Sequence, residues 1–143
     1  MPYKYLPEIS MADIAFKAWG SSMEEMFESA AAATTNVMVK ELKTIKHKKK
    51  INIKVEAGTV EKLLFNFIDD ILFYKDAKQL LFSKYKIKIK EDKGVFTLKA
   101  EFSGEKLNMK KHELIVDVKA VTMHHFEVVH KNGRWAATVV LDI

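Results

Sequence analysis

The stretch TVEKLLFNFIDDILFYKDAKQLLFSKYKIKIKEDKGVFTLKAEF, Thr59 to Phe102, contains two different spacings of apolar residues. The first part has apolar residues at three- and four-residue intervals, which predicts an amphipathic helix with Thr59 as its N-cap: Val60, Leu63, Leu64, Phe67, Ile68, Ile71 and Leu72. The second part alternates apolar residues with polar ones, mostly lysines, which predicts two strands joined by a turn at Asp92-Lys93-Gly94. A helix followed by such strands is typical of the α+β class.

The sequence before this stretch predicts a strand, a helix and a second strand. The first strand covers Asp13 to Trp19 and ends at Gly20. Ser22 and Glu25 have the spacing of a capping box, and the helix after them has an apolar stripe: Met23, Met26, Phe27, Ala30, Ala33 and Val37. A lysine-rich connector, Lys43 to Lys50, leads to a strand with one apolar face: Ile51, Ile53 and Val55.

The sequence after Phe102 predicts further strands. Ser103-Gly104 is expected to end the strand before it, and strands are expected from about Leu114 to Lys119 and from Thr122 to His130. Asn132-Gly133 is a strong hairpin signal and leads into the last strand. Together the segments predict an α+β fold with two helices packed on a mainly antiparallel β-sheet, as a single domain over residues 1–143.

Composition excludes several classes of protein. The 143 residues include no cysteine, so disulfides, cysteine-ligated zinc and thiol catalysis are excluded. No apolar run is long enough to span a bilayer and the first residues lack the apolar core of a signal peptide, so we expect a cytoplasmic protein without a membrane partner. The net charge of +5 favours acidic partners without naming one.

Asp142 is an acidic residue near the end of an otherwise apolar strand. If Asn132 and Gly133 form the hairpin loop, counting back along both strands places Asp142 opposite Met123 and Val140 opposite His125. His125 would then be a diagonal neighbour of Asp142 on the less apolar face, where it could support that carboxylate. The other face is expected to be the core side: Trp135, Ala137, Val139 and Leu141.

Two interpretations of this strand end are open from the hairpin alone. Asp142 and the carboxylate of Ile143 are either solvated at a frayed end or brought together by a cation that relieves their repulsion. Oxygen-only ligation would suit a hard cation such as calcium or magnesium.

Four segments, taken together, resemble the archease family. They are Ser10 to Ala31, with the A-D-I motif at its start; the helix EKLLFNFIDDILF; Val116 to Val129, with V-K-A-V-T; and the terminal VLDI. They occur in the family's order and at similar spacing, over essentially the whole chain.

The resemblance implies a protein that is not an enzyme but activates RtcB-type RNA ligases, which join tRNA halves after intron removal. It implies that the activator promotes guanylylation of the ligase, allows multiple turnover and broadens nucleotide triphosphate use, with tRNA contacted indirectly through the ligase. It also implies a metal site at Asp13, Asp142 and the carboxylate of Ile143, for calcium first and magnesium or manganese as alternatives. Lys119 of V-K-A-V-T is a further candidate, to orient a phosphate or balance the acids, or else an outward strand lysine.

Other candidate residues support different functions less well. His124 and His125 would point to opposite faces of a regular strand and could not chelate one ion together. The basic run 46–50 is either a solvated loop or a contact for RNA or an acidic patch, and Trp19 and Trp135 are expected to be core or half-buried packing residues. No phosphate loop or nucleophile motif occurs. The alternative function is a general chaperone or modulator of RNA- or DNA-modifying enzymes.

Overall fold

A computed structural model describes residues 2–7 and 13–143, so residues 10–12 of the motif segment lie outside the described part. The first half of the chain contains β1 (Tyr3–Tyr5), β2 (Asp13–Gly20), α1 (Met23–Met38), a short 3-10 helix η1 (Leu42–Thr44) and β3 (Lys49–Ala57). The second half contains α2 (Val60–Lys78), β4 (Leu80–Asp92), β5 (Val95–Lys106), β6 (Ala120–Lys131) and β7 (Arg134–Asp142).

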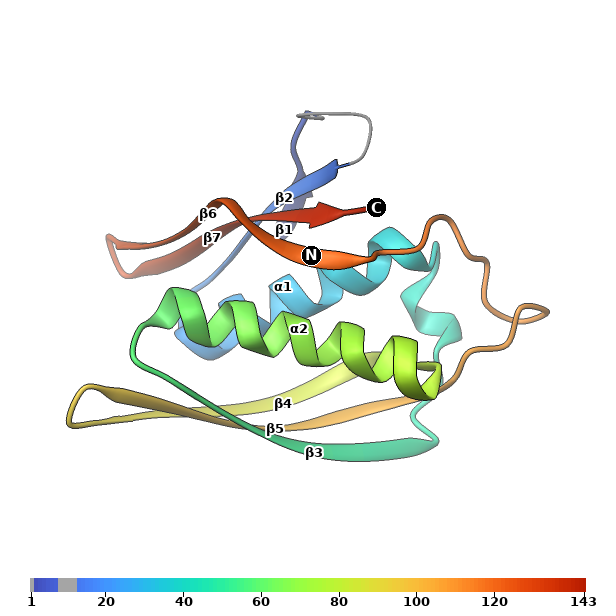
Figure 1. Cartoon of the computed structure of the whole chain (residues 1–143), viewed down its shortest axis with the longest axis horizontal. Helices are drawn as coiled ribbons and strands as arrows, with labels where there is room; N and C mark the ends of the chain where they lie inside the picture. Colours follow the sequence, from blue (N-terminus) through green and yellow to red (C-terminus); the bar gives the residue numbers. More distant parts are fainter. Residues whose placement is uncertain (1, 8–12) are drawn as a thin grey trace.

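The strands form two sheets with the two helices between them (Figure 1). One sheet has the order β1-β2-β7-β6 and the other has the order β3-β5-β4, and every strand pair is antiparallel. The core is formed by the apolar helix stripes and the inner sheet faces, with Phe27, Phe67 and Phe102 fully buried. The predicted α+β class and its two helices on antiparallel sheet are confirmed.

Both helices begin at the predicted N-caps. Thr59 Oγ1 accepts a hydrogen bond from the Lys62 amide, and Ser22 Oγ accepts one from the Glu25 amide. The Glu25 carboxylate does not complete the predicted box at the Ser22 amide, since it accepts from the amide and hydroxyl of Ser21 instead. These hydrogen bonds lower the pKa of Glu25, which favours its ionised form at the positive end of α1.

The β4–β5 hairpin confirms the predicted turn, because Lys93 and Gly94 adopt φ values of 51° and 80°. The predicted break at Ser103-Gly104 is wrong, since β5 continues to Lys106. Gly104 lies beside a bulge in β4, where a Cβ atom would overlap the carbonyl oxygen of Leu81. This glycine therefore permits a close approach of two strands and does not end one.

The predicted strand from Leu114 to Lys119 is also wrong. This segment is irregular, and its Leu114 makes only an isolated bridge with Val39. It runs back from the end of β5 to β6, and β6 contains the whole segment predicted from Thr122 to His130, so that strand is confirmed. The hairpin at Asn132 and Gly133 is confirmed, with φ values of 54° and 71°. No described helix is long and apolar enough to cross a membrane.

Candidate functional site

Asp13 and Asp142 lie directly opposite each other where β2 and β7 pair. Asp142 also pairs with Ala120 of β6 on its other side, so it lies on an inner strand of the sheet and not at a frayed edge. The neighbouring residues Phe16, Val139 and Leu141 belong to the buried core, and strand alternation therefore directs both aspartates to the face away from the helices. Directly opposed residues have Cβ atoms about 4.5–5.5 Å apart, so the two carboxylates can approach one cation.

The predicted position of His125 is wrong. From Lys131 to Glu127 the register follows the prediction, but residues 123–126 then lie opposite Val139 alone, and Thr122 pairs with Val140. The cause is a bulge in which His125 adopts a φ of 54°, a conformation that a regular strand never uses. Asp142 is consequently opposite Ala120 and not Met123.

The bulge also changes how the two adjacent histidines lie. The rings of His124 and His125 are 4.1 Å apart between centroids, so the expectation that they point to opposite faces is wrong. His125 lines a hollow of about 400 Å³ together with Val140, Glu127 and Pro7. It shares the outer face with Asp142 but has lost the register position that would make it a diagonal neighbour.

Lys119 reaches Asp142 through its backbone. Its amide donates a 2.8 Å hydrogen bond to the Asp142 carbonyl oxygen, and its side chain is exposed. The segment before it is held by Lys75 of α2, whose buried ammonium donates to Asp117 at 2.7 Å and to the Val118 carbonyl at 2.7 Å. Lys75 therefore helps to fix the segment that ends at Lys119, beside the two aspartates.

The donor set at this strand end suits a hard cation. Asp13 and Asp142 offer carboxylate oxygens and Ile143 adds its main-chain oxygens, while no sulfur or nitrogen ligand is among them. Among residues 2–7 and 13–143, no group of three His, Asp or Glu side chains is arranged to hold a metal. A cation here would consequently need the Ile143 carboxylate, water or a partner's oxygen atoms besides the two aspartates.

The lysine-rich connector is anchored by Glu105. Burial by itself would raise the pKa of Glu105, but hydrogen bonds from Lys111, the Lys46 amide and His112 outweigh it and hold the pKa at about 2. His112, which is 1% exposed, binds Glu105 at 3.0 Å and also accepts from the Asn108 amide. The connector backbone is therefore fixed while the lysine side chains from 46 to 50 remain exposed.

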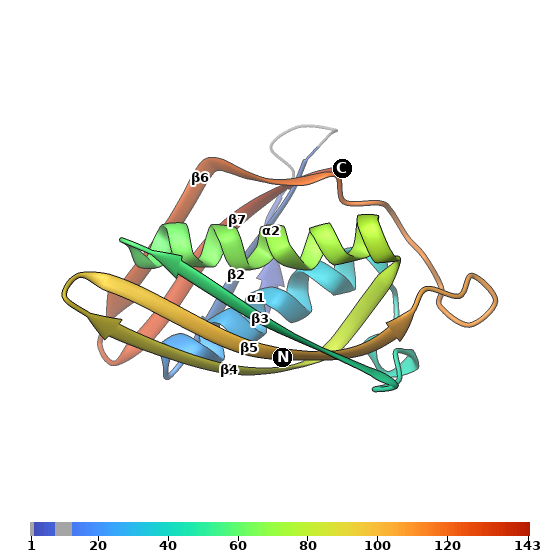
Figure 2. The same cartoon turned by 60° about the horizontal axis from the view of Figure 1, so that its bottom comes forward.

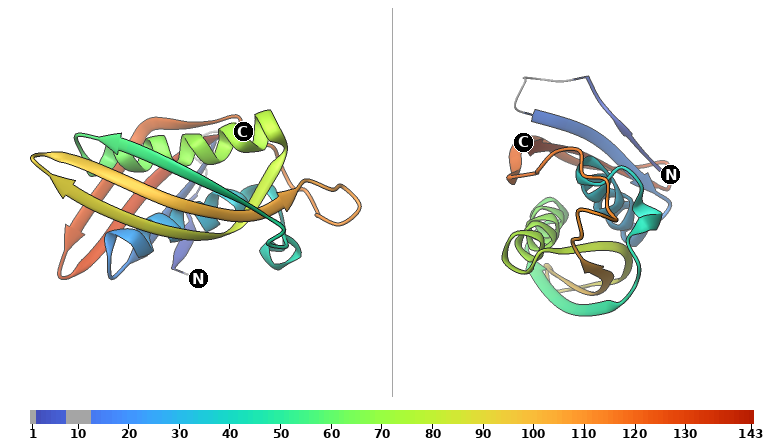
Figure 3. Two further views of the ribbon diagram at one scale, coloured as in Figure 1. Left: turned by 90° about the horizontal axis from the view of Figure 1, so that it is seen from below. Right: turned by 90° about the vertical axis from the view of Figure 1, so that its right-hand side faces the viewer.

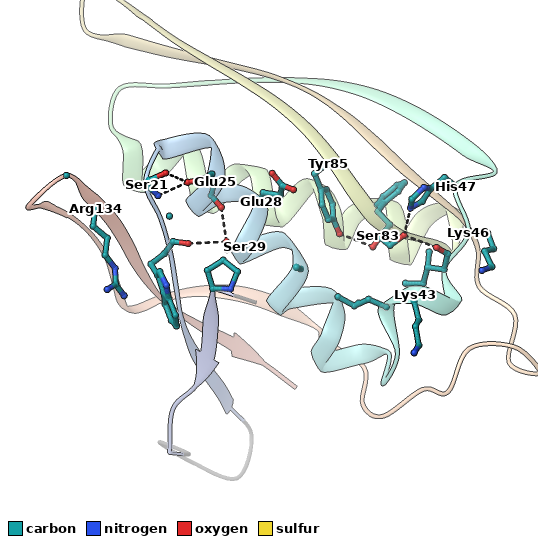
Figure 4. A pocket seen from close by; sticks show the side chains of 18 residues that line it. Ser21, Glu25, Glu28, Ser29, Lys43, Lys46, His47, Ser83, Tyr85 and Arg134 are labelled. Carbon is teal, nitrogen blue, oxygen red and sulfur yellow. Dashed lines mark hydrogen bonds between the residues drawn. The ribbon is translucent and has the colours of Figure 1, made fainter.

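Neither aspartate lines a second hollow, and no motif in the sequence indicates it (Figure 4). Its volume is about 920 Å³, and it extends from Trp19 and Arg134 along α1 to the connector and β4. Tyr85 and Phe82 contribute to its wall, and Glu28 and Lys43 lie on its rim. Partial burial and then the nearby Glu25 raise the pKa of Glu28.

The tryptophans pack as expected for half-buried residues. Arg134 lies over the Trp19 ring at 4.9 Å from its centroid, and His130 stacks on Trp135 with centroids 4.0 Å apart. Their ring faces are thus used within the protein, which agrees with packing roles.

Three comparisons agree on one family. A sequence model of the Archease protein family matches residues 3–143. Protein archease of Pyrococcus furiosus is 37% identical over 133 residues, covering 92% of this chain and 93% of the relative, and that of Sulfolobus acidocaldarius is 40% identical over 132 residues with the same coverage.

Solved structures give the same result. The solution structure of a Methanobacterium thermoautotrophicum protein superposes with a TM-score of 0.87 at 32% identity, over 99% of both chains. A crystal structure from Thermotoga maritima, of an archease described as a possible chaperone, superposes with a TM-score of 0.59 over 96% of both chains, and at 19% identity it supports the fold alone. Together with the full-length match in sequence, these findings show that the chain belongs to the archease family.

Proposed function

We propose that this protein is a non-catalytic activator of an RtcB-type RNA ligase in tRNA splicing, acting in the cytoplasm. It promotes guanylylation of the ligase, allows repeated turnover and broadens nucleotide triphosphate use. Family membership supports the choice of partner through the resemblance described above. The single observation that carries the site is the direct pairing of Asp13 with Asp142 at one strand end.

The two aspartates, with the carboxylate of Ile143, would hold a divalent cation, calcium first and magnesium or manganese as alternatives. The cation would supply positive charge for binding phosphate groups of the nucleotide. Asp13 and Asp142 contribute oxygen ligands from two rigid strands, so their spacing is set by the β2–β7 pairing. Lys119 follows the segment fixed by Lys75 and binds the Asp142 carbonyl oxygen through its amide, and its exposed ammonium would orient a phosphate.

The function is tested with a purified RtcB-type ligase, GTP and cleaved RNA. The measurement is the number of RNA molecules joined per ligase molecule, with and without this protein. We expect the protein to raise this number well above one, and D13A or D142A to abolish the increase. If the native protein leaves turnover unchanged, the function is wrong; if both variants activate normally, the acidic site is wrong.

A second candidate function is a general chaperone of RNA- or DNA-modifying enzymes. The observation that favours it is the 920 Å³ hollow with apolar side chains such as Leu42, Ile45 and Phe82 in its wall. A chaperone would suppress thermal aggregation of unrelated client enzymes, measured by light scattering, without dependence on Asp142. Suppression that disappears in A32W, which would place a bulky ring in the hollow, and persists in D142A would support this function over the first.

A further inference from the structure

The outer face of the β3-β5-β4 sheet carries a concentration of lysines. Figures 2 and 3 show this sheet at the outside of the molecule, with the helices on its inner side and no described element over its outer side. We call this surface the lysine face. It is defined by seven exposed lysines that alternate with core residues along the three strands: Lys50, Lys54, Lys84, Lys86, Lys88, Lys90 and Lys99.

The strand register places like charges directly opposite one another. Lys99 of the central strand β5 pairs with Lys54 of β3 on one side and with Lys88 of β4 on the other. Like charges in directly opposed positions destabilise a sheet. A row of three lysines across all three strands therefore costs free energy in the isolated protein, and a bound polyanion would relieve that cost.

Few acids balance these lysines. Glu56 is paired with Lys54 at 3.2 Å, and Glu101 is paired with Lys50 at 3.7 Å. Within the described chain, no carboxylate lies within 4.0 Å of the ammonium groups of the remaining five lysines. Most of the positive charge on the lysine face is consequently available to a partner.

A second group of lysines adjoins this face where β3 begins and β5 ends. They line a hollow of about 620 Å³: Lys48, Lys49, Lys106, Lys110 and Lys111. The acid in this hollow, Glu105, already binds Lys111 at 2.8 Å and His112 at 3.0 Å. The positive surface thus extends beyond the sheet to the loop after β5.

We propose that the lysine face binds the phosphate backbone of RNA. Lysine is depleted at protein interfaces, whereas clustered lysines are the usual electrostatic footprint of nucleic-acid binding. Val95, at the hairpin tip, is the one exposed large apolar side chain on these three described strands, so the face lacks a cluster of aromatic or apolar side chains to anchor a protein partner. Because it offers charges and no stacking platform, binding depends on phosphates and not on base sequence.

The lysine face and the paired aspartates belong to different sheets, separated by the helix layer (Figure 1). RNA on the lysine face would not cover the strand end with Asp13 and Asp142, so one molecule could contact RNA and the ligase together. The choice of RNA among polyanions rests on the proposed function. The test of RNA binding uses no ligase, so a failure of RNA binding can be distinguished from a failure of ligase activation.

The test measures fluorescence anisotropy of a labelled single-stranded RNA of mixed sequence against the full-length protein between 50 and 200 mM salt. The face variant neutralises four lysines: K86Q, K88Q, K90Q and K99Q. The control variant removes the same charge from exposed lysines elsewhere: K4Q, K62Q, K78Q and K131Q. Each phosphate contact contributes about −0.7 to the slope of log affinity against log salt, so four contacts weaken native binding about 50-fold over this range.

We expect the salt slope of the face variant to be smaller than the native slope by about 2.8, about 0.7 for each lysine removed, and the control variant to keep affinity within about twofold of the native protein. Circular dichroism checks that each variant folds. If the face variant does not fold, K99Q alone is expected to reduce the salt slope by about 0.7. Equal losses in the face and control variants, or no binding by the native protein at 50 mM salt, would overturn the proposal. Binding of polyglutamate as tight as that of RNA would overturn it in favour of an acidic protein partner.

Discussion

Replacing Asp142 with asparagine should change the stability of the protein in opposite directions with and without calcium. If the two carboxylates keep the separation of opposed Cβ atoms, about 5 Å, they repel by about 1 kcal/mol in a water-like medium and about 3 kcal/mol near a protein surface. Since Asp142 is only half-buried, we take about 1 kcal/mol for the repulsion between the Asp13 and Asp142 carboxylates. Without metal, D142N should therefore melt about 4 °C higher than the native protein.

With calcium the order should reverse. A cation present at 100 times its Kd stabilises the native protein by about 2.7 kcal/mol, which is about 10 °C for a chain of this length, and D142N should lose nearly all of that gain. The assay is thermal unfolding followed by circular dichroism, in EDTA and in a calcium series. E127Q is the matched control, because Glu127 is an exposed acid of the same sheet, opposite Thr138.

D142N melting below the native protein in EDTA would refute the charge argument. An equal calcium response in the native protein and D142N would refute the cation site. E127Q should behave like the native protein in both solutions.

Three further substitutions test the supporting structure. E105Q should lower the free energy of unfolding by about 1–3 kcal/mol near pH 6. Because the folded pKa of Glu105 lies below its unfolded value, this deficit should shrink as the pH falls from about 4.5 towards 2. Urea unfolding at pH 6 and pH 3 measures the deficit, and a deficit that does not depend on pH would contradict the reasoning. K75M should lower the free energy of unfolding by about 1–3 kcal/mol and should speed hydrogen exchange at the Lys119 amide. Unchanged exchange at this amide would show that Lys75 does not fix the segment before Lys119. K99E should raise the free energy of unfolding by about 0.4–2 kcal/mol, because it places an acid between Lys54 and Lys88. A lower free energy of unfolding in urea would contradict the repulsion among these three lysines.

The parts of the fold that follow from local spacing could be predicted from the sequence. Thr59 and Ser22 cap their helices through side chains that lie within one turn, and Asn132-Gly133 forms its hairpin from two residues with positive φ. Such features depend on neighbours in the chain, so residue type and spacing are enough to indicate them.

The errors have non-local or conformational causes. The bulge at His125 shifts the register of β6 because one residue adopts a left-handed conformation, and a single histidine is too weak a signal to predict it. Gly104 suggests a strand end because glycine is common in turns, whereas the close approach of Leu81 from the neighbouring strand requires a glycine at this position. The segment from Leu114 to Lys119 has strand-like residues but is held by side-chain and backbone contacts to α1, α2 and β7.

The candidate site was predictable only in part. Asp142 stands out as an acid near the end of a mostly apolar strand, and the family resemblance adds Asp13. The separate positions of these residues in the sequence do not indicate that the two strands pair in this register. The link from Lys75 through Val118 to Lys119 joins three elements, so no local pattern could have indicated it. The lysine row of Lys54, Lys99 and Lys88 likewise exists only once three strands are aligned.

The most direct test of the proposed activator function is guanylylation of an RtcB-type ligase after its first round of joining. Radiolabelled GTP and magnesium or manganese are supplied, and the fraction of labelled ligase is measured with the native protein, D142N and the E127Q control. We predict that the native protein and E127Q restore the labelled fraction and that D142N leaves it near the level of the ligase alone. Full labelling with D142N would contradict the claim that the paired aspartates activate the ligase.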